Sequence, residues 1–326
     1  MSAYELTRVV KIIQITLYAL TIILGSAGNS MVIWTIWLRL KPNATNVWLV
    51  NLAVADLVFC ISRILSVISL HLHQWPFKDL LCQVNGLVKY TTMFYSIFLL
   101  VVISADRALS IWRPLQAKGR RTVSMARVVS VGVWVVALAL SMPYAINRTT
   151  DLNVNNKTKC TMETMESKRV RACLFLMRFL FGFLLPFLVI ACCYALAWWG
   201  IRRSHLNRKA KILRTLVLLV LAFFLCYAPY HVLLLVKMVN KKNNWVRLGL
   251  PVAKGLSYFN SCVNPILYFC VGMDRRKTFR RSISGALRRA LEDDGIAPVT
   301  KGGQTGREGV KFQNQRAKDE NVNEKL

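Results

Sequence analysis

The sequence predicts an all-α protein: a bundle of seven transmembrane helices, with an amphipathic eighth helix on the inner leaflet. Of the 326 residues, 55% are hydrophobic and only 18% are charged, and the mean hydropathy is +0.39. The apolar residues fall into seven blocks, each long enough for the roughly 20 residues that cross a bilayer as a helix. Only short segments separate the blocks, so a soluble enzyme with a membrane anchor is excluded.

The elements follow from this division of the chain. The first ten residues include an acid and lack a small-residue cleavage pattern, so we expect no cleavable signal peptide. After Gly272, Phe279, Ile283 and Leu287 share a face opposite Arg, Lys and Ser, which is typical of a helix lying on a membrane. The expected spans are 9–38, 45–72, 80–112, 123–145, 171–201, 210–238 and 246–271. The expected domains are an extracellular stub (1–8), the seven-helix domain (9–271), the amphipathic helix (272–291) and a disordered cytoplasmic tail (292–326).

The distribution of charge indicates which way the bundle faces. The net charge of +29 comes from 44 Lys and Arg against 15 Asp and Glu, which in a soluble protein would suggest nucleic acid. In a membrane protein Lys and Arg collect in cytoplasmic loops, and here they crowd the loops after spans one, three and five and the start of the tail. We therefore expect a multi-pass plasma-membrane protein with no nucleic-acid partner, an extracellular N-terminus and a cytoplasmic C-terminus.

The cysteines and glycosylation sequons agree with this orientation. Of nine Cys, only Cys82 and Cys160 lie at outer-loop positions, where oxidising conditions permit a disulfide. Asn147 and Asn156 begin sequons in one outer loop, and we expect both to carry glycans. Asn43 also begins a sequon, but it falls on the inner side and should stay bare.

Polar residues inside the spans predict an ion site. Asp56 lies in the middle of the second span, and ionisable groups at such depth are costly and usually functional. Ser96, Asn260 and Asn264 lie at comparable depths. One carboxylate with several oxygen partners favours sodium, and the alternative is a water-filled polar network without a specific ion.

Four cationic side chains in the outer halves of the spans predict an anionic ligand. Arg63, Lys89 and Lys254 each stand seven residues outward of an interior polar residue and on its face, and Arg178 stands eight residues outward of Pro186. Uncompensated cations in one cavity repel each other and favour an anion, which Arg178 can bind in bidentate fashion when the anion is a carboxylate. The alternative is that each side chain extends toward the lipid headgroups.

Helix-bending and boundary residues form a third group of interior signals. Pro186, Pro229 and Pro265 each remove a backbone hydrogen bond, which predicts helices that bend between two states. Asp106 and Arg107 stand together at the inner end of the third span, where such a pair also occurs as a simple boundary feature. Apart from Arg107 the inner half lacks ionisable residues along a path, which argues against a channel or transporter.

Taken together, these motifs resemble the rhodopsin-like (class A) G-protein-coupled receptors over about residues 10–290. The resemblance is carried by Gly28-Asn29, Asn51-Leu-Ala-Val-Ala-Asp56, Cys82, Asp106-Arg107-Ala108, Trp134, Pro143, Pro186, Tyr194, Phe223, Cys226-Tyr-Ala-Pro229 and Asn264-Pro-Ile-Leu-Tyr268. It implies a receptor and not an enzyme, with no cofactor besides an allosteric sodium ion. The implied partners are a heterotrimeric G-protein, of the inhibitory type, together with arrestin and receptor kinases.

The resemblance also implies roles for particular residues. The sodium site would consist of Asp56, Ser96, Asn260 and Asn264. The connector that repacks on activation would consist of Ile97, Pro186 and Phe223. The inner activation contacts would be Arg107, Tyr194 and Tyr268, and the G-protein would contact Arg107, Pro114 and Leu115. Two departures stand out. The aromatic toggle, commonly Trp, is Tyr227, and Lys209 lies where an acid often pairs with Arg107. We therefore expect some basal activity.

Within the class, the chain resembles the leukocyte chemoattractant receptors. The motifs Gly182-Phe-Leu-Leu-Pro-Phe187 and Phe259-Asn-Ser-Cys-Val-Asn-Pro265 carry this likeness. Pro229-Tyr-His231 with Arg178 is similar to the prostaglandin D receptor type, and leukotriene B receptors belong to the same group. We therefore expect an acidic lipid mediator, with a chemotactic peptide (formyl-peptide, anaphylatoxin or chemerin-like) as the alternative. The expected ligand contacts are Arg178, Lys89, Lys254, Arg63, Tyr90, Tyr230 and His231.

Overall fold

The computed structural model describes residues 3–40, 42–113, 119, 121–152, 156–162, 168–204, 207–240 and 243–272. The expected G-protein contacts Pro114 and Leu115 lie outside the described residues. So do the tail expected over 292–326 and all of the expected amphipathic helix beyond Gly272.

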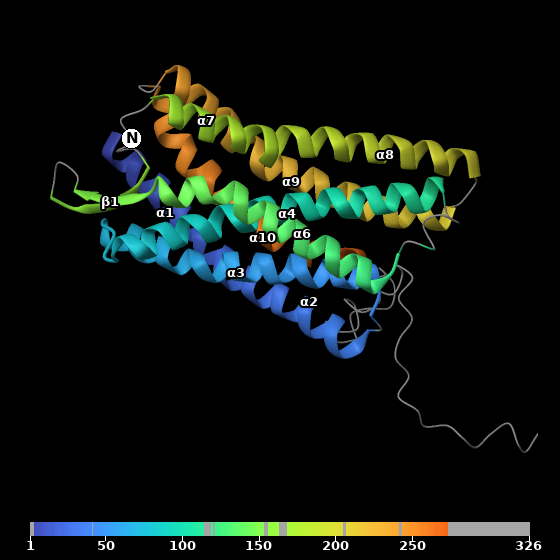
Figure 1. The fold of residues 1–326 in the computed structure, drawn as a ribbon. Helices are drawn as coiled ribbons and strands as arrows, with labels where there is room; N and C mark the ends of the chain where they lie inside the picture. The colour runs from blue at the N-terminus through green and yellow to red at the C-terminus, as the bar shows by residue number, and fades with distance from the viewer. Residues whose placement is uncertain are drawn as a thin grey trace, which may run out of the picture.

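Seven helical rods make up the described part of the bundle, and the predicted all-α architecture is confirmed (Figure 1). In chain order the rods are α1 (Ala3–Leu20) with the π-helix η1 (Thr21–Gly25) and α2 (Ser26–Arg39); α3 (Ala44–Leu72); α4 (Asp79–Trp112); α6 (Val123–Ile146); α7 (Lys168–Phe179) with the π-helix η2 (Leu180–Leu184) and α8 (Leu185–Ser204); α9 (Asn207–Val239); and α10 (Asn244–Gly272). The first rod begins at Ala3 rather than Val9, so most of the expected stub is helical, because no Pro or Gly interrupts residues 3–8.

The rods have the length and composition of membrane spans. Among the described residues, six of them are long and apolar enough to cross a bilayer. The seventh, α10, is less apolar because it carries Lys254, Asn260 and Asn264. Outward-facing apolar side chains such as Val128, Val131 and Val135 of α6 are more than half exposed in the protein alone, as expected for side chains that contact lipid.

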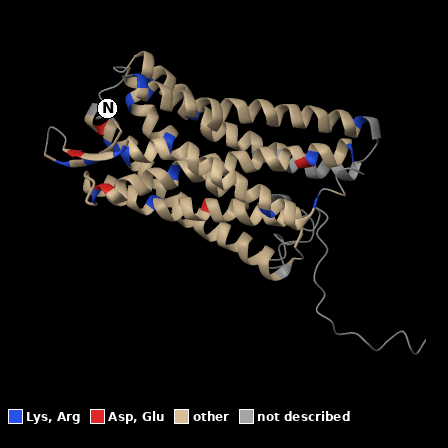
Figure 2. Ribbon diagram, viewed as in Figure 1, with Lys and Arg blue, Asp and Glu red and all other residues tan. Residues whose placement is uncertain are grey.

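A short β-hairpin marks one end of the bundle. Its strands β1 (Thr149–Leu152) and β2 (Thr158–Thr161) are antiparallel, with Thr150 opposite Cys160. The hairpin and the N-terminus lie at the same end, called the hairpin end below (Figure 1). The helix α4 begins beside the hairpin, so Arg107, close to the last residue of this helix, lies toward the opposite end. Lys and Arg gather toward both ends of the bundle, and the middle is mostly uncharged (Figure 2).

The core is built around α4, which packs against α3, α6, α8 and α9. Phe94, Tyr95, Ile97 and Leu99 of this helix are fully buried. Lipid is as apolar as these side chains, so helices in a bilayer associate through close packing, and small residues permit the closest approach. At Gly28, in α2, a Cβ atom would lie 2.8 Å from Cγ of Pro265, so this glycine lets the first and seventh rods touch.

The two π-helices η1 and η2 are features that the sequence analysis missed. A π turn accommodates one more residue than an α turn, and such bulges frequently occur at functional sites. The second one, η2, separates Arg178 from Pro186 in the fifth rod. The faces of the two residues therefore cannot be related by α-helical counting alone.

Candidate functional site

Arg178 lies in a ring of tyrosines near the hairpin end. Its Nη1 donates hydrogen bonds to the hydroxyl oxygens of Tyr90 (3.1 Å) and Tyr230 (3.0 Å). The guanidinium carbon also lies 5.2 Å from the ring centroid of Tyr230, within the range of a cation–π interaction. Three rods, through α4, α7 and α9, thus bring together three of the residues predicted to bind ligand, and Arg178 is only 8% exposed.

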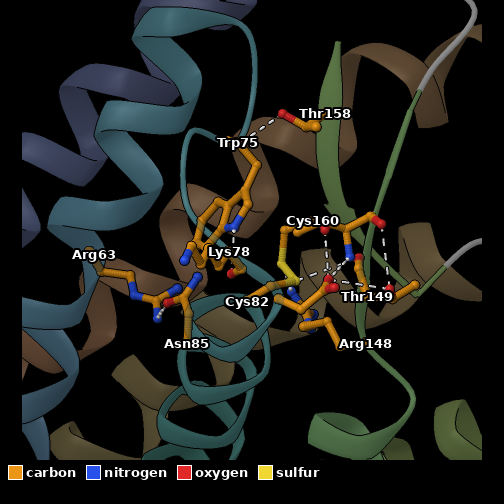
Figure 3. Close-up of a disulfide and its surroundings, with 11 residues drawn as sticks. Arg63, Trp75, Lys78, Cys82, Asn85, Arg148, Thr149, Thr158 and Cys160 are labelled. Carbon is orange, nitrogen blue, oxygen red and sulfur yellow. Dashed lines mark hydrogen bonds between the residues drawn. A yellow bond between two sulfur atoms is a disulfide. The ribbon is translucent and has the colours of Figure 1, made fainter. Parts of the chain in front are cut away.

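Arg63 of α3 is held by neutral partners. Its Nη2 donates to Asn85 Oδ1 at 2.9 Å (Figure 3). The same nitrogen donates to Ser62 Oγ at 3.0 Å, and Nη1 lies 3.4 Å from Ser66 Oγ. The guanidinium stacks above Phe59, 4.7 Å from the ring centroid. These contacts fix the orientation of a side chain that is 1% exposed without neutralising its charge.

Lys89 and Lys254 approach the same tyrosine as Arg63. Measured to the ring centroid of Tyr258, Arg63 Cζ lies at 5.0 Å, Lys89 Nζ at 5.3 Å and Lys254 Nζ at 5.7 Å. Tyr258 itself packs against Tyr18, with the ring centroids 4.9 Å apart and the ring planes tilted by 36°. One aromatic ring therefore collects three positive charges from three different rods.

Two cavities divide these cations, which corrects the expectation that all four share one. A wide cavity of about 140 Å³ is lined by Arg63 and Lys254. A narrow cavity is lined by Arg178 and has a volume of about 10 Å³, the room for a single water molecule. Lys89 and Tyr258 line both cavities and form the wall between them. The separation arises because the Lys89 side chain extends between the rings of Tyr90 and Tyr258, a contact that residue spacing does not reveal.

Arg148 is a fifth cation of this site, and the sequence analysis did not predict its presence there. It lines the wide cavity, and its Nη1 lies 3.6 Å from Cys160 Sγ. Its Cδ and Nε would lie 2.8 Å from a Cβ atom at Gly86, so the glycine makes room for the arginine. In the sequence, only Gly86 in α4 indicated that a large side chain could approach this part of the helix. Neither cavity has Asp or Glu among its described lining residues, so the five positive charges have no carboxylate partner there.

His231, predicted to contact ligand, lines neither cavity. It is 1% exposed and packs among aromatic rings, with its centroid 4.7 Å from Phe183 and 5.7 Å from Tyr230. Neither ring nitrogen has a hydrogen-bond partner among the described residues. His231 therefore lies behind Tyr230 and away from the space open to a ligand.

The hairpin is fastened beside the wide cavity by a disulfide and by two sets of hydrogen bonds. The predicted disulfide between Cys82 and Cys160 is confirmed, with the Cα atoms 5.6 Å apart (Figure 3). Asp79 accepts hydrogen bonds from the backbone N–H and hydroxyl of Thr150, both at 2.6 Å. The hydroxyl of Thr158 donates a 2.7 Å hydrogen bond to the carbonyl oxygen of Trp75, and the backbone N–H of Trp75 donates a 2.8 Å hydrogen bond to the carbonyl oxygen of Thr158. Cys160 and Trp75 also line the wide cavity, so the hairpin forms part of its wall.

A cleft beside the wide cavity opens between α1, α9 and α10. It measures about 540 Å³, and it shares Gln14 and Lys254 with the wide cavity. Lys237 and Arg247 also line it, so the approach is basic as well.

The predicted ion site lies deeper, between α3, α4 and α10. Asp56 Oδ2 accepts a 2.7 Å hydrogen bond from Asn264 Nδ2, and Asp56 Oδ1 lies 3.4 Å from Ser96 Oγ. Asn260 is buried one helical turn from Asn264, on the same face of α10. One carboxylate with neutral hydroxyl and amide groups fits a singly charged hard cation, and no group of three or more His, Cys, Asp or Glu lies together in the described part of the chain.

At the opposite end, the acid of the Asp106-Arg107 pair contacts a different arginine. Asp106 Oδ1 lies 3.0 Å from Nε of Arg121, which follows α4 in the chain. Both Arg107 and Arg121 donate to the hydroxyl of Thr45, at 3.0 and 2.8 Å. Tyr194 in α8 accepts from Ser104 at 3.3 Å. The side chains of Tyr268 and Lys209 lie outside the described residues.

The predicted connector residues occupy the middle of the bundle. Ile97 and Phe223 are buried in one core cluster, and Phe223 stacks on Tyr227 with centroids 4.5 Å apart. Pro186 is buried, whereas Pro229 is exposed on the outer side of α9. Tyr227, at the position of the aromatic toggle, thus stacks on Phe223, which lies one helical turn away in α9.

Comparison with known proteins identifies the class. The chain matches the family described as "7 transmembrane receptor (rhodopsin family)" over residues 28–268. It is 36% identical to the C3a anaphylatoxin chemotactic receptor of Danio rerio, over 88% of this chain and 79% of that receptor. It is 33% identical to formyl peptide receptor 2 of Mus musculus, over 89% and 88%, and 34% identical to chemerin-like receptor 2 of Mus musculus, over 86% and 81%.

The chain therefore belongs to the rhodopsin family of seven-transmembrane receptors. Within that family it is a receptor of the chemoattractant type, as its similarity to the C3a, formyl-peptide and chemerin-like receptors shows. Membership implies a membrane-embedded receptor that couples to a G-protein. The predicted class and the chemoattractant group are both confirmed.

Proposed function

We propose that this receptor binds an extracellular chemotactic peptide through a carboxylate and passes the signal to a heterotrimeric G-protein of the inhibitory type. The observation that carries the proposal is the set of five cations around the two cavities, with no acid among the described lining residues. A carboxylate held by Arg178, between Tyr90 and Tyr230, would relieve the repulsion among these charges.

A peptide fits better than the acidic lipid that we first expected. The relatives carry names that refer to the C3a anaphylatoxin, formyl peptides and chemerin. The wide cavity is also lined largely by polar side chains, among them Gln14, Ser66, Ser69 and Asn85. A long acyl chain needs an apolar wall, whereas a peptide terminus can use these hydrogen-bonding groups.

The proposed orientation places the hairpin end outside the cell and the Arg107 end in the cytoplasm. The disulfide supports this, because such bonds persist in oxidising surroundings. Arg107, Pro114 and Leu115 would then face the G-protein, and arrestin and receptor kinases would act on the same side, at the plasma membrane. Asp56, Ser96, Asn260 and Asn264 would hold the allosteric sodium ion.

A ligand screen in cells expressing the receptor tests the proposal. G-protein activation is measured with pools of short peptides that have free C-termini, with the same peptides as C-terminal amides, and with a panel of acidic lipids. We expect activation by free-acid peptides, loss of potency in the amides, and sensitivity to an inhibitor of inhibitory G-proteins. Equal potency of acid and amide would refute the carboxylate contact, and activation by acidic lipids alone would restore the lipid alternative.

A further inference from the structure

We infer that the ligand carries two anionic groups, one for Arg178 and a second for Arg63, Lys89 and Lys254 around Tyr258. The inference rests on the proposed function and assigns a second anionic subsite within the same site. The chemical class is a peptide with an acidic side chain next to its terminal carboxylate, as in a chain that ends in Asp or Glu.

The second subsite has its own group of charges. Arg63, Lys89 and Lys254 come from α3, α4 and α10, and each lies within 5.7 Å of the centroid of Tyr258. The ring attracts cations through its quadrupole, but it supplies no formal negative charge. Three charges gathered at one ring, in a cavity without a described acid, are compensated only when an anion enters.

Arg63 makes this a built site rather than a chance meeting of flexible lysines. Its guanidinium is oriented by Asn85, Ser62 and Ser66, all uncharged, and its Nε has no hydrogen-bond partner among the described residues. The side chain is 1% exposed and lines the wide cavity. The chain thus keeps a fully charged arginine buried and correctly oriented without neutralising it, which suits the recognition of a carboxylate.

The position of Lys89 determines how far apart the two anionic groups are. Its Nζ lies 4.9 Å from the ring centroid of Tyr90, the tyrosine that accepts a hydrogen bond from Arg178. It lies 5.3 Å from the centroid of Tyr258, the ring that collects the other cations. Because Lys89 lines both cavities, one ligand can place an anionic group on each side of it. Neighbouring carboxylates on one peptide residue meet that requirement.

The test uses straight-chain dicarboxylates from succinate to suberate as probes, each compared with its own monomethyl ester. The thermal stability of the purified full-length receptor is measured with each probe at several concentrations. We expect one or two chain lengths to bind at least about tenfold more tightly as the diacid, because a second charge-assisted hydrogen bond is formed. Lys254→Gln should remove this preference, and Lys254→Arg should restore it.

Lys159→Gln is the matched control, because it removes a positive charge from the exposed face of β2 without altering either cavity. It should leave the preference unchanged. Arg178→Gln should weaken binding of diacid and half-ester alike. If the half-ester binds in an Arg178-dependent way and the diacid binds no better, the second subsite is refuted and the proposed function stands. If neither compound stabilises the receptor, the anionic site itself is refuted, and both proposals fail.

Discussion

At the scale of single residues, Arg178 combines a positive charge with an orientation that is fixed by hydrogen bonds. One nitrogen of its guanidinium is occupied by Tyr90 and Tyr230, and its Nε has no partner among the described residues. A guanidinium in such a position can still present N–H groups to a carboxylate without releasing the tyrosines that orient it.

Arg178→Ala should lower the potency of an acidic agonist by about ten- to a hundredfold, since a charge-assisted hydrogen bond contributes about 1.5–3 kcal/mol. Arg178→Lys should recover part of the loss, because the charge returns without the planar fork. Concentration–response curves for G-protein activation measure both. Arg169→Ala removes an exposed arginine near the start of α7 that lines neither the two cavities nor the cleft beside them, and it serves as the control. An equal loss in this control would mean that general charge, and not Arg178, attracts the ligand.

Gly28 is a residue whose importance is steric. Gly28→Ala places a methyl group 2.8–2.9 Å from the ring of Pro265, which is too rigid to move aside. We expect a loss of stability of about 1–3 kcal/mol, as for other overpacked sites, seen as a lower melting temperature of the purified receptor. Gly132→Ala is matched to it, because nothing lies within 4 Å of that position, and it should be neutral or slightly stabilising. A Gly28→Ala receptor as stable as the wild type would show that the first and seventh rods do not approach this closely.

At the scale of elements, the hairpin distinguishes two sequons that look equivalent in the sequence. Asn156 is exposed in the turn between the strands, with a φ of 57°. Asn147 caps the end of α6, and its side-chain nitrogen donates a 2.7 Å hydrogen bond to the carbonyl of Pro143. The nitrogen that would receive a glycan is thus accessible at Asn156 and occupied at Asn147.

We therefore expect Asn156 to be the main glycan acceptor. Asn156→Gln should raise the electrophoretic mobility of the receptor from cells to that of enzymatically deglycosylated protein, and Asn147→Gln should leave it nearly unchanged. The opposite pattern would mean that the sequon is glycosylated before α6 and the hairpin adopt this arrangement.

Helix geometry also explains which parts of the site the sequence could predict. In α3, α4 and α10, seven residues along uninterrupted α-helix make about two turns, so Arg63, Lys89 and Lys254 were correctly placed on interior faces. In the fifth rod, η2 absorbs an additional residue, and eight residues there cover about the same angle as seven elsewhere. Arg178 faces the interior because of this additional residue, and a count based on α-helical geometry alone could not have predicted that orientation.

The division into two cavities could not be predicted in this way. Spacing along a helix gives the depth and face of a residue, but it does not show which side chains fill the space between rods. The wall between the cavities depends on where Lys89 extends relative to Tyr90 and Tyr258. Arg148 entered the site through contacts with Gly86 and Cys160, which come from other elements. The apolar spans, by contrast, follow from composition over long windows and were predicted nearly complete.

At the scale of the whole molecule, the same helices connect the proposed ligand site with the middle of the bundle. Along α9, Tyr230 contacts Arg178, whereas Phe223 and Tyr227 stack lower in the same helix. Along α10, Lys254 lines the wide cavity and Asn264 donates to Asp56. A movement of either helix at the hairpin end therefore changes contacts deeper in the bundle.

Asp56→Asn tests this connection. If sodium binds at Asp56, adding sodium should lower agonist affinity in the wild type, and the variant should lose that dependence together with part of its signalling, since its central charge is gone. Agonist competition binding with sodium or with an organic cation as the chloride salt measures the effect. Asp151→Asn, on the exposed strand β1, removes an acid far from the interior and should retain the sodium effect. Sodium sensitivity that persists in Asp56→Asn would rule out this carboxylate as the ion site.

Because the narrow cavity is small, we expect the affinity of a ligand and its ability to activate the receptor to depend on different parts of the ligand. With room for one water molecule, it admits a carboxylate only if Tyr90, Lys89 or Tyr230 moves, and Tyr230 belongs to α9. A ligand shifts a receptor between states only through a difference in its affinity for them. A compound confined to the wide cavity leaves α9 in place, so it should occupy the receptor tightly and act as an antagonist. Extending that compound by a single anionic group toward Arg178 should convert it into an agonist with little change in the remainder of its contacts.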